Sequence, residues 1–211
     1  MNRRGIVGWL AACTASLACG ACEVLDPPRE LPVPHYLADD AALREVRRIM
    51  VLPFRVQDGV QTDAWPVRNA MLRELSKVQR FEVVPLPERA PEHGPIHEAL
   101  VRGRLDTSSL AELAARYRID GVVLGTITAE RPYTPPHLGV RTSLVSLHDG
   151  ETLWKVDSVF DAADARVVED CRHYAASFQA EEASMHGYEM NLLSPTRFAS
   201  YVAHRVAGTL R

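Results

Sequence analysis

The sequence predicts an α/β fold (α+β): a mixed sheet of about five strands flanked by helices, with a helical carboxyl-terminal extension. Short apolar runs alternate with segments of helical periodicity in the order strand, helix, strand, helix, strand. A hairpin signal then joins two more strands, and helical periodicity marks the remainder of the chain. Because β-α-β crossovers join parallel strands, the first three strands are expected to be parallel and the hairpin antiparallel.

The first crossover follows an expected helical lead-in over residues 38–48. Residues 48–56 read RIMVLPFRV, and an unbroken apolar run of this kind is typical of a strand covered on both faces. Pro53 removes one ladder donor and marks an edge or a bulge. Residues 66–79 carry apolar side chains at helical spacing and begin with a proline suited to a first turn. Residues 81–85 are expected to form the second strand.

The second crossover begins at Ser109, which has capping-box spacing with Glu112 and predicts a helix to about Arg118. A third strand is expected over residues 122–128. Strands over residues 138–147 and 152–161 are joined by a His-Asp-Gly-Glu turn, which is typical of a hairpin.

Two helices are predicted beyond the hairpin. Asp164 is placed to cap a helix that carries apolar residues as far as Phe178. Ser194 and Pro195 have the arrangement of an N-cap followed by a proline at the first position, and they open a helix whose apolar stripe reaches Leu210.

The amino terminus predicts export followed by lipidation. A cationic Met-Asn-Arg-Arg start precedes the uncharged residues 5–15, which have the length of a secretory apolar region. The stretch Ser-Leu-Ala-Cys then resembles the lipobox of bacterial lipoproteins, in which the cysteine thiol receives a diacylglyceryl group. The resemblance implies that residues 1–18 are a signal peptide and that Cys19 becomes the acylated first residue. Gly20 is not the Asp that would retain such a protein at the inner membrane.

Other cysteines offer alternatives. Cys13 has the better lipobox by residue identity but leaves only about eight apolar residues before it. Cys22 lacks the bulky apolar residue before it, and a redox or zinc role for the C-x-x-C pair would need a βαβ context or a second ligand pair, which does not follow. Cys171 lies on an apolar helix stripe and is expected to be a buried, inert thiol. A disulfide between Cys22 and Cys171 remains open in an oxidising compartment.

Composition and motifs exclude several functions. A formal net charge of −3 and a pI near 6.2 give no footprint for nucleic acid. No apolar run after the first twenty-odd residues reaches the roughly 18 to 20 needed to cross a bilayer as a helix. His93 and His97 are separated by a helix-breaking Gly-Pro, and Glu182 with His186 supplies only two ligands. No cofactor or metal is therefore expected.

The segments RRIMVLPF, QRFEVVP, LAARYRIDGVVLGTIT and SLHDGETLWKVD resemble the bacterial lipoprotein group that includes CsgG and LpoB. The resemblance covers residues 48–161. It implies a small α/β domain held at the outer membrane by lipid, facing the periplasm, that contacts an envelope protein or copies of itself.

These observations divide the chain into four parts: a signal peptide over residues 1–18, a Pro-rich tether and lead-in over 19–47, the α/β domain over 48–161, and a helical extension of the same domain over 162–211. The expected function is that of a non-enzymatic, lipid-anchored envelope lipoprotein that binds or scaffolds a partner in assembly, secretion or cell-wall synthesis. A strand edge or the carboxyl-terminal helices would make the contact.

Two alternatives remain open. One is a periplasmic hydrolase that uses residues such as His173, Glu182 and His186. The other is an oligomeric export component.

Overall fold

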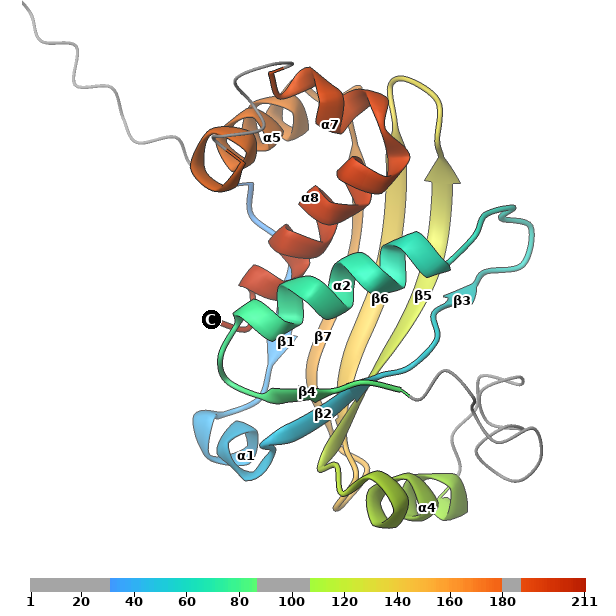
Figure 1. The fold of residues 1–211 in the computed structure, drawn as a ribbon, viewed down its shortest axis with the longest axis vertical. Coiled ribbons are helices and arrows are strands. Elements are labelled where there is room, and N and C mark those ends of the chain that lie inside the picture. The colour runs from blue at the N-terminus through green and yellow to red at the C-terminus, as the bar shows by residue number, and fades with distance from the viewer. Residues whose placement is uncertain (1–30, 87–106, 180–186) are drawn as a thin grey trace, which may run out of the picture.

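The computed structural model of the chain describes residues 31–86, 107–179 and 187–211. These residues contain one mixed sheet of seven strands in the order β1-β7-β6-β5-β2-β4, with β3 paired to β5 (Figure 1). The strands are β1 (His35–Leu37), β2 (Arg48–Val51), β3 (Arg55–Val56), β4 (Glu82–Val84), β5 (Gly121–Arg131), β6 (His137–Ser146) and β7 (Thr152–Asp161). The helices are α1 (Asp40–Glu45), α2 (Trp65–Lys77), α4 (Thr107–Tyr117), α5 (Ala165–Phe178), α7 (Glu189–Leu193) and α8 (Pro195–Gly208).

The strand directions agree with the sequence-based expectation. Strand β2 lies between β4 and β5 and is parallel to both, with Ile49 opposite Val83 on one side and Gly121 on the other. The pairs β5–β6 and β6–β7 are antiparallel. The mixed α/β fold is therefore confirmed, with seven strands where about five were expected.

One of the additional strands arises because Pro53 divides the strand predicted over residues 48–56. The Leu52 amide still donates to the Val123 carbonyl at 3.0 Å, but Pro53 has no N–H to continue the ladder. Pairing resumes at Arg55, which lies opposite Thr126 as part of β3.

Helix starts were predicted with mixed success. The N-caps are confirmed at Asp164, which accepts from the Arg166 amide at 2.9 Å, and at Ser194, which accepts from the Arg197 amide at 3.4 Å. The start predicted at Ser109 is wrong, because α4 begins at Thr107 and Ser109 lies buried within its first turn. Helix α7 was not predicted.

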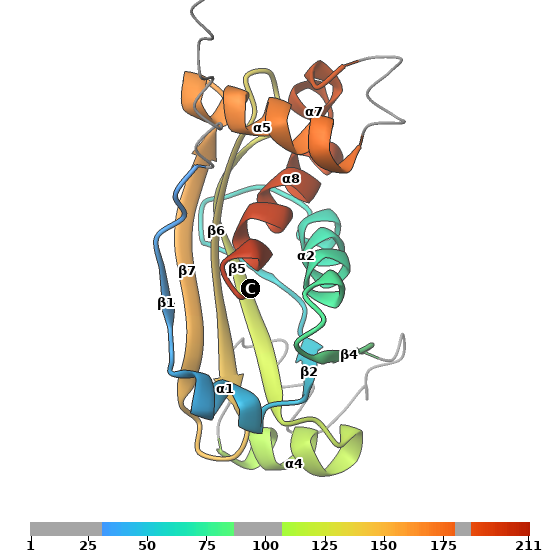
Figure 2. The ribbon, with the colours of Figure 1, turned by 90° about the vertical axis from the view of Figure 1, so that its left-hand side faces the viewer.

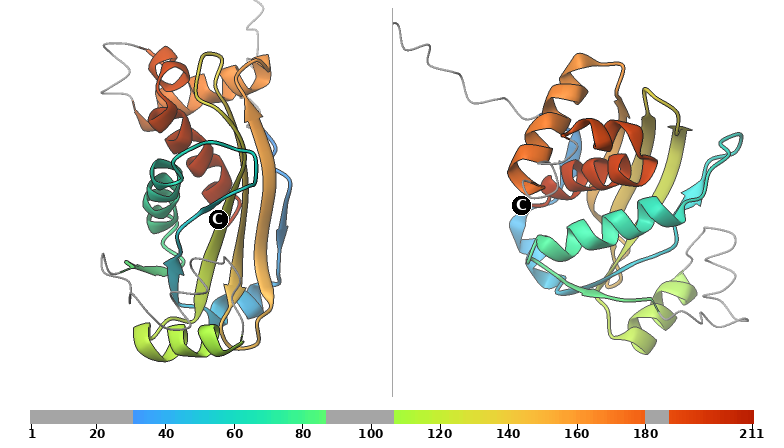
Figure 3. Two further views of the ribbon diagram at one scale, coloured as in Figure 1. Left: turned by 90° about the vertical axis from the view of Figure 1, so that its right-hand side faces the viewer. Right: turned by 45° about the horizontal axis from the view of Figure 1, so that its top comes forward.

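Two hydrophobic clusters lie on opposite faces of the sheet. The larger lies beneath α2, α5 and α8, which cover one face of the sheet (Figure 2). Trp154, Phe160 and Tyr201 are almost completely buried in this cluster. The smaller joins α4 to Met50 and Val122. The sheet is thus covered along one face, and on the other face only at its α4 end among the described residues (Figure 3).

The other additional strand lies in the range expected to be tether. Residues 31–37, which we name the strap, run beside β7 at the edge of the sheet, where β1 pairs antiparallel with β7 (Figure 2). Leu31, Val33 and Leu37 pack against the main core, whereas Pro32, Pro34 and Tyr36 are exposed. This alternation is that of a half-buried strand.

Candidate functional site

A buried ion pair fastens the strap to the helices. Asp170 of α5 accepts a hydrogen bond from the Leu31 amide at 2.9 Å, and Arg205 of α8 donates to the Leu31 carbonyl at 2.6 Å. The Arg205 Nε lies 3.1 Å from the Asp170 carboxylate, and the two side chains are 11% and 5% exposed. Both polar groups of Leu31 are therefore held by one charged pair, which we name the strap clamp.

Tyr201 of α8 also binds the Asp170 carboxylate of the strap clamp. Its hydroxyl donates to Asp170 Oδ2 at 2.7 Å, and its ring packs edge-on against Phe160 at 6.0 Å. Burial, together with the hydrogen bond to Asp170, raises the pKa of Tyr201, so that the phenol stays protonated and acts as a donor. The buried carboxylate thus accepts two hydrogen bonds, from the Leu31 amide and the Tyr201 hydroxyl, and has the Arg205 guanidinium as its counter-charge, as a desolvated charge requires.

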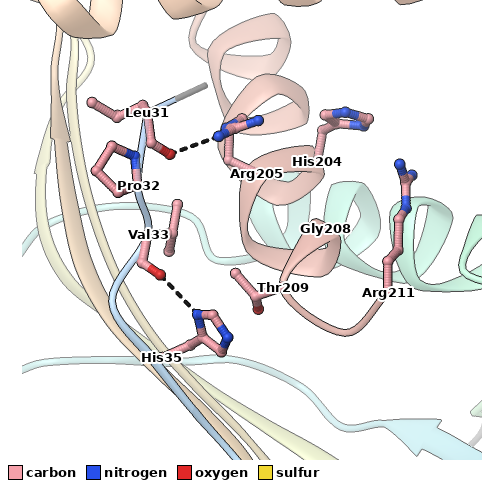
Figure 4. A pocket seen from close by; sticks show the side chains of 9 residues that line it. All are labelled: Leu31, Pro32, Val33, His35, His204, Arg205, Gly208, Thr209 and Arg211. Carbon is pink, nitrogen blue, oxygen red and sulfur yellow. Dashed lines mark hydrogen bonds between the residues drawn. The ribbon is translucent and has the colours of Figure 1, made fainter. Parts of the chain in front are cut away.

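A pocket of about 540 Å³ lies between the strap and the end of α8 (Figure 4). Several of its polar lining groups have intramolecular partners. His35 Nδ1 lies 2.9 Å from the Val33 carbonyl, and Arg205 belongs to the strap clamp. The Thr209 hydroxyl accepts from Trp154 Nε1 at 2.8 Å and donates to the Val206 carbonyl at 2.7 Å. The Thr209 hydroxyl is thus engaged by Trp154 and Val206, and these bonds give this part of the pocket wall a structural role.

A second buried network joins α2 to α8. Glu74 lies 3.0 Å from His204 Nδ1 and 2.5 Å from Lys77 Nζ. Burial would raise the pKa of Glu74, but the hydrogen bonds from His204 and Lys77 outweigh it and hold that pKa below its ordinary value. The His204 ring also lies 4.3 Å from that of Phe178, so this histidine is packed into the helix interface.

The predicted candidate residues are only partly covered by the structure. Seven of them lie outside the described residues: Cys13, Cys19, Cys22, His93, His97, Glu182 and His186. Cys19 as the lipidation site therefore stays a prediction, as does the Cys22–Cys171 disulfide.

Cys171 and His173 do not form a catalytic pair. The Cys171 side chain is fully buried, and burial raises the pKa of its thiol to about 12. The His173 side chain is 39% exposed, and its Nε2 lies 3.1 Å from Glu169 on the same helix. The expectation of a buried thiol is confirmed, and the thiol lies in the core whereas the imidazole lies at the surface.

The sheet face opposite α2 and α8, which we name the outer face, carries mixed polar and apolar side chains. Arg141 of β6 and Asp157 of β7 lie opposite each other and pair at 2.7 Å. Tyr36 and Val159, on the same face by register, are 54% and 55% exposed. Among the described residues, α4 covers this face only around β2 and the start of β5.

No group of three or more His, Cys, Asp or Glu side chains able to hold a metal ion occurs within the described ranges. None of the helices in those ranges is both long and apolar enough to span a membrane.

No family model matches the chain, and no curated protein matches it. Several solved structures, in contrast, are similar to this chain. The PelC dodecamer from Paraburkholderia phytofirmans has a TM-score of 0.44 and 14% identity, over 66% of this chain and 88% of that one. Lipoprotein GNA1162 from Neisseria meningitidis has a TM-score of 0.42 and 15% identity, over 65% and 98%. LpoB from Escherichia coli has a TM-score of 0.38 and 12% identity, over 76% and 87%.

The expected likeness to LpoB and other bacterial lipoproteins thus recurs among solved structures at low identity, whereas a likeness to CsgG is not shown.

Proposed function

We propose that the protein is an outer-membrane lipoprotein, anchored through an acylated Cys19 and facing the periplasm, that binds an envelope protein rather than catalysing a reaction. The observation that carries the proposal is the strap clamp. Leu31, the first described residue after the proposed anchor at Cys19, is fastened to the folded body by Asp170 and Arg205, which hold both of its backbone polar groups. A body attached to a membrane through its amino terminus needs a firm junction at this point, since unsecured termini fray.

The outer face supports the binding role. It offers Tyr36 and Val159 as exposed apolar side chains beside the exposed Arg141–Asp157 pair. An aromatic ring and an arginine among polar neighbours are typical components of a protein-binding surface. The strands beneath them are fixed by the main core, so this surface is pre-organised.

The non-enzymatic role is supported by where the side chains of His204, His173 and Cys171 lie. His204 is buried between α2 and α8, where it pairs with Glu74. His173 lies on the surface of α5, and the thiol two residues before it, that of Cys171, is buried in the core.

Site-specific photo-cross-linking in cells tests the binding role. A photoreactive phenylalanine analogue at Val159 on the outer face is expected to give a discrete adduct with one envelope protein. The same analogue at Ser76, exposed on the far side of α2, is the matched control and is expected to give none. Equal labelling at both positions, or no adduct from Val159, would contradict the proposal.

The hydrolase alternative has its own test. Alanine substitution at His173, Glu182 and His186 together is expected to leave the cellular phenotype unchanged, whereas Cys19→Ala is expected to abolish function. Loss of function in the triple variant with normal folding and localisation would favour the hydrolase.

A further inference from the structure

One end of the molecule lies beside Leu31, the first residue that the structure describes. Leu31 is held between α5 and α8, close to the end formed by α5, α7 and the β5–β6 turn (Figures 1 and 2). Helices α1 and α4 and the β6–β7 turn form the opposite end (Figure 1).

The same end carries large exposed apolar side chains. Tyr133 in the β5–β6 turn is 79% exposed, Phe178 at the end of α5 is 57% exposed, and Leu193 at the end of α7 is 58% exposed. The three elements that bear them lie together at this end (Figure 3, right). The other described large hydrophobic side chains of comparable exposure, Tyr36, Trp65 and Val159, lie on β1, at the start of α2 and on β7, and α1, α4 and the β6–β7 turn carry none.

Among the described residues of this end, several charged side chains pair with one another. Three arginines here have carboxylate partners on the surface: Arg131 pairs with Asp161, Arg166 with Asp164, and Arg172 with Glu169. Long-range attraction to anionic lipid is therefore weak, and apolar contact is the interaction that this end offers.

The tether keeps this end close to the bilayer. Residues 20–30 separate Cys19 from Leu31, and a fully extended chain spans at most roughly 3.6 Å per residue, or about 40 Å in total. The eleven residues of β5 span a similar length, at roughly 3.3 Å each. The end that carries Leu31 therefore stays within about 40 Å of the anchor, whereas the α4 end can lie farther away by the length of β5, so the Leu31 end meets the lipid surface at the higher effective concentration.

From these observations we propose that the α5–α7 end rests on the lipid surface, with Tyr133, Phe178 and Leu193 in the headgroup region. The occupant of this apolar end is the bilayer itself. The outer face then stands upright and accessible from the side, and the α4 end points away from the membrane. This inference rests on the proposed anchor at Cys19.

Fluorescence quenching in vesicles tests the orientation without relying on lipidation in the cell. The chain from residue 19 with Cys22→Ser is coupled through Cys19 to a maleimide lipid in phosphatidylcholine vesicles, and Cys171 stays unreacted because it is buried. Trp65→Phe removes the exposed native tryptophan, and Trp154 is buried. Leu193→Trp then reports on the α5–α7 end, and His148→Trp, in the exposed β6–β7 turn, is the matched control.

Bromine-labelled acyl chains are expected to reduce the emission of the Leu193→Trp probe about twofold, since interfacial side chains reach the boundary of headgroups and acyl chains. The His148→Trp probe should be unaffected. Adding Tyr133→Glu and Phe178→Glu should abolish the quenching of Leu193→Trp, and raised salt should leave it unchanged. Equal emission from both probes in labelled and unlabelled vesicles, quenching of the control alone, or loss of quenching in salt would overturn the orientation.

The two proposals can fail separately. An unmodified Cys19 in cells would remove the proposed anchor but would leave the vesicle result standing. Absence of quenching in the coupled chain would remove the lipid contact but would leave the anchor standing.

Discussion

Asp170→Asn is the change that most directly perturbs the junction between tether and body. The substitution is nearly isosteric, so it removes a charge without opening a cavity. The asparagine oxygen can still accept from the Leu31 amide, but its NH2 group cannot accept from the Tyr201 hydroxyl or neutralise Arg205. A buried guanidinium is then left without its counter-charge.

The loss of stability expected for Asp170→Asn follows from these contacts. Removing one partner of a buried pair costs about 3–5 kcal/mol. Because Arg205 keeps its bond to the Leu31 carbonyl, we expect Asp170→Asn to lower the free energy of unfolding by about 3 kcal/mol, the lower end of this range. Asp157→Asn makes the same chemical change in a pair whose side chains are 45% and 50% exposed, where a loss of about 0–1 kcal/mol is expected.

Urea unfolding at neutral pH compares the two variants with the parent chain. With a denaturant slope of about 2 kcal/mol/M, Asp170→Asn should lower the midpoint by about 1.5 M, and Asp157→Asn should lower it by less than about 0.5 M. Equal midpoints for the two variants would show that the clamp does not hold the strap, and the reasoning would be refuted.

Three further predictions concern the core, the thiol and the buried glutamate. Gly125→Ala should destabilise the fold by about 1–3 kcal/mol in urea unfolding, because the new Cβ would lie 2.3 Å from the Phe54 ring; Gly208→Ala, which meets nothing within 4 Å, is the control, and equal effects would contradict the account. Cys171 should resist alkylation at pH 8 in the native chain and react in urea, as followed by mass spectrometry, since burial raises its pKa to about 12; rapid native alkylation would contradict it. The pKa of Glu74 is held below its ordinary 4.5, so its contribution to stability is present above that value and is lost as pH falls below it; the difference in unfolding free energy between the parent and Glu74→Gln should therefore shrink on acidification, and a constant difference from pH 7 to pH 3 would be inconsistent with this pairing.

Much of the fold could be predicted from local patterns. The apolar run at residues 49–52 and the helical stripe of residues 66–79 indicated the first crossover, because each buries its apolar side chains at the period of its own secondary structure. The turn residues after Leu147 and the caps at Asp164 and Ser194 placed the hairpin and two helices. These signals act within a few residues, so a single sequence reveals them.

The strap could not be predicted in this way. Pro32 and Pro34 indicate an extended spacer, and they hide the alternation of Leu31, Val33 and Leu37 that packs this segment onto the core. The clamp was missed because Leu31 lies 139 positions from Asp170 and 174 from Arg205. Taken alone, an aspartate and an arginine on two amphipathic helices look like ordinary surface residues, and only the packing of α5 beside α8 makes them a buried pair.

The mass of the mature amino terminus, measured on protein extracted from the membranes of its own cells, tests the central claim most directly. The account predicts that the chain begins at Cys19 and carries the added mass of a diacylglyceryl group and acyl chains. A chain that retains residues 1–18 with an unmodified Cys19 would contradict it.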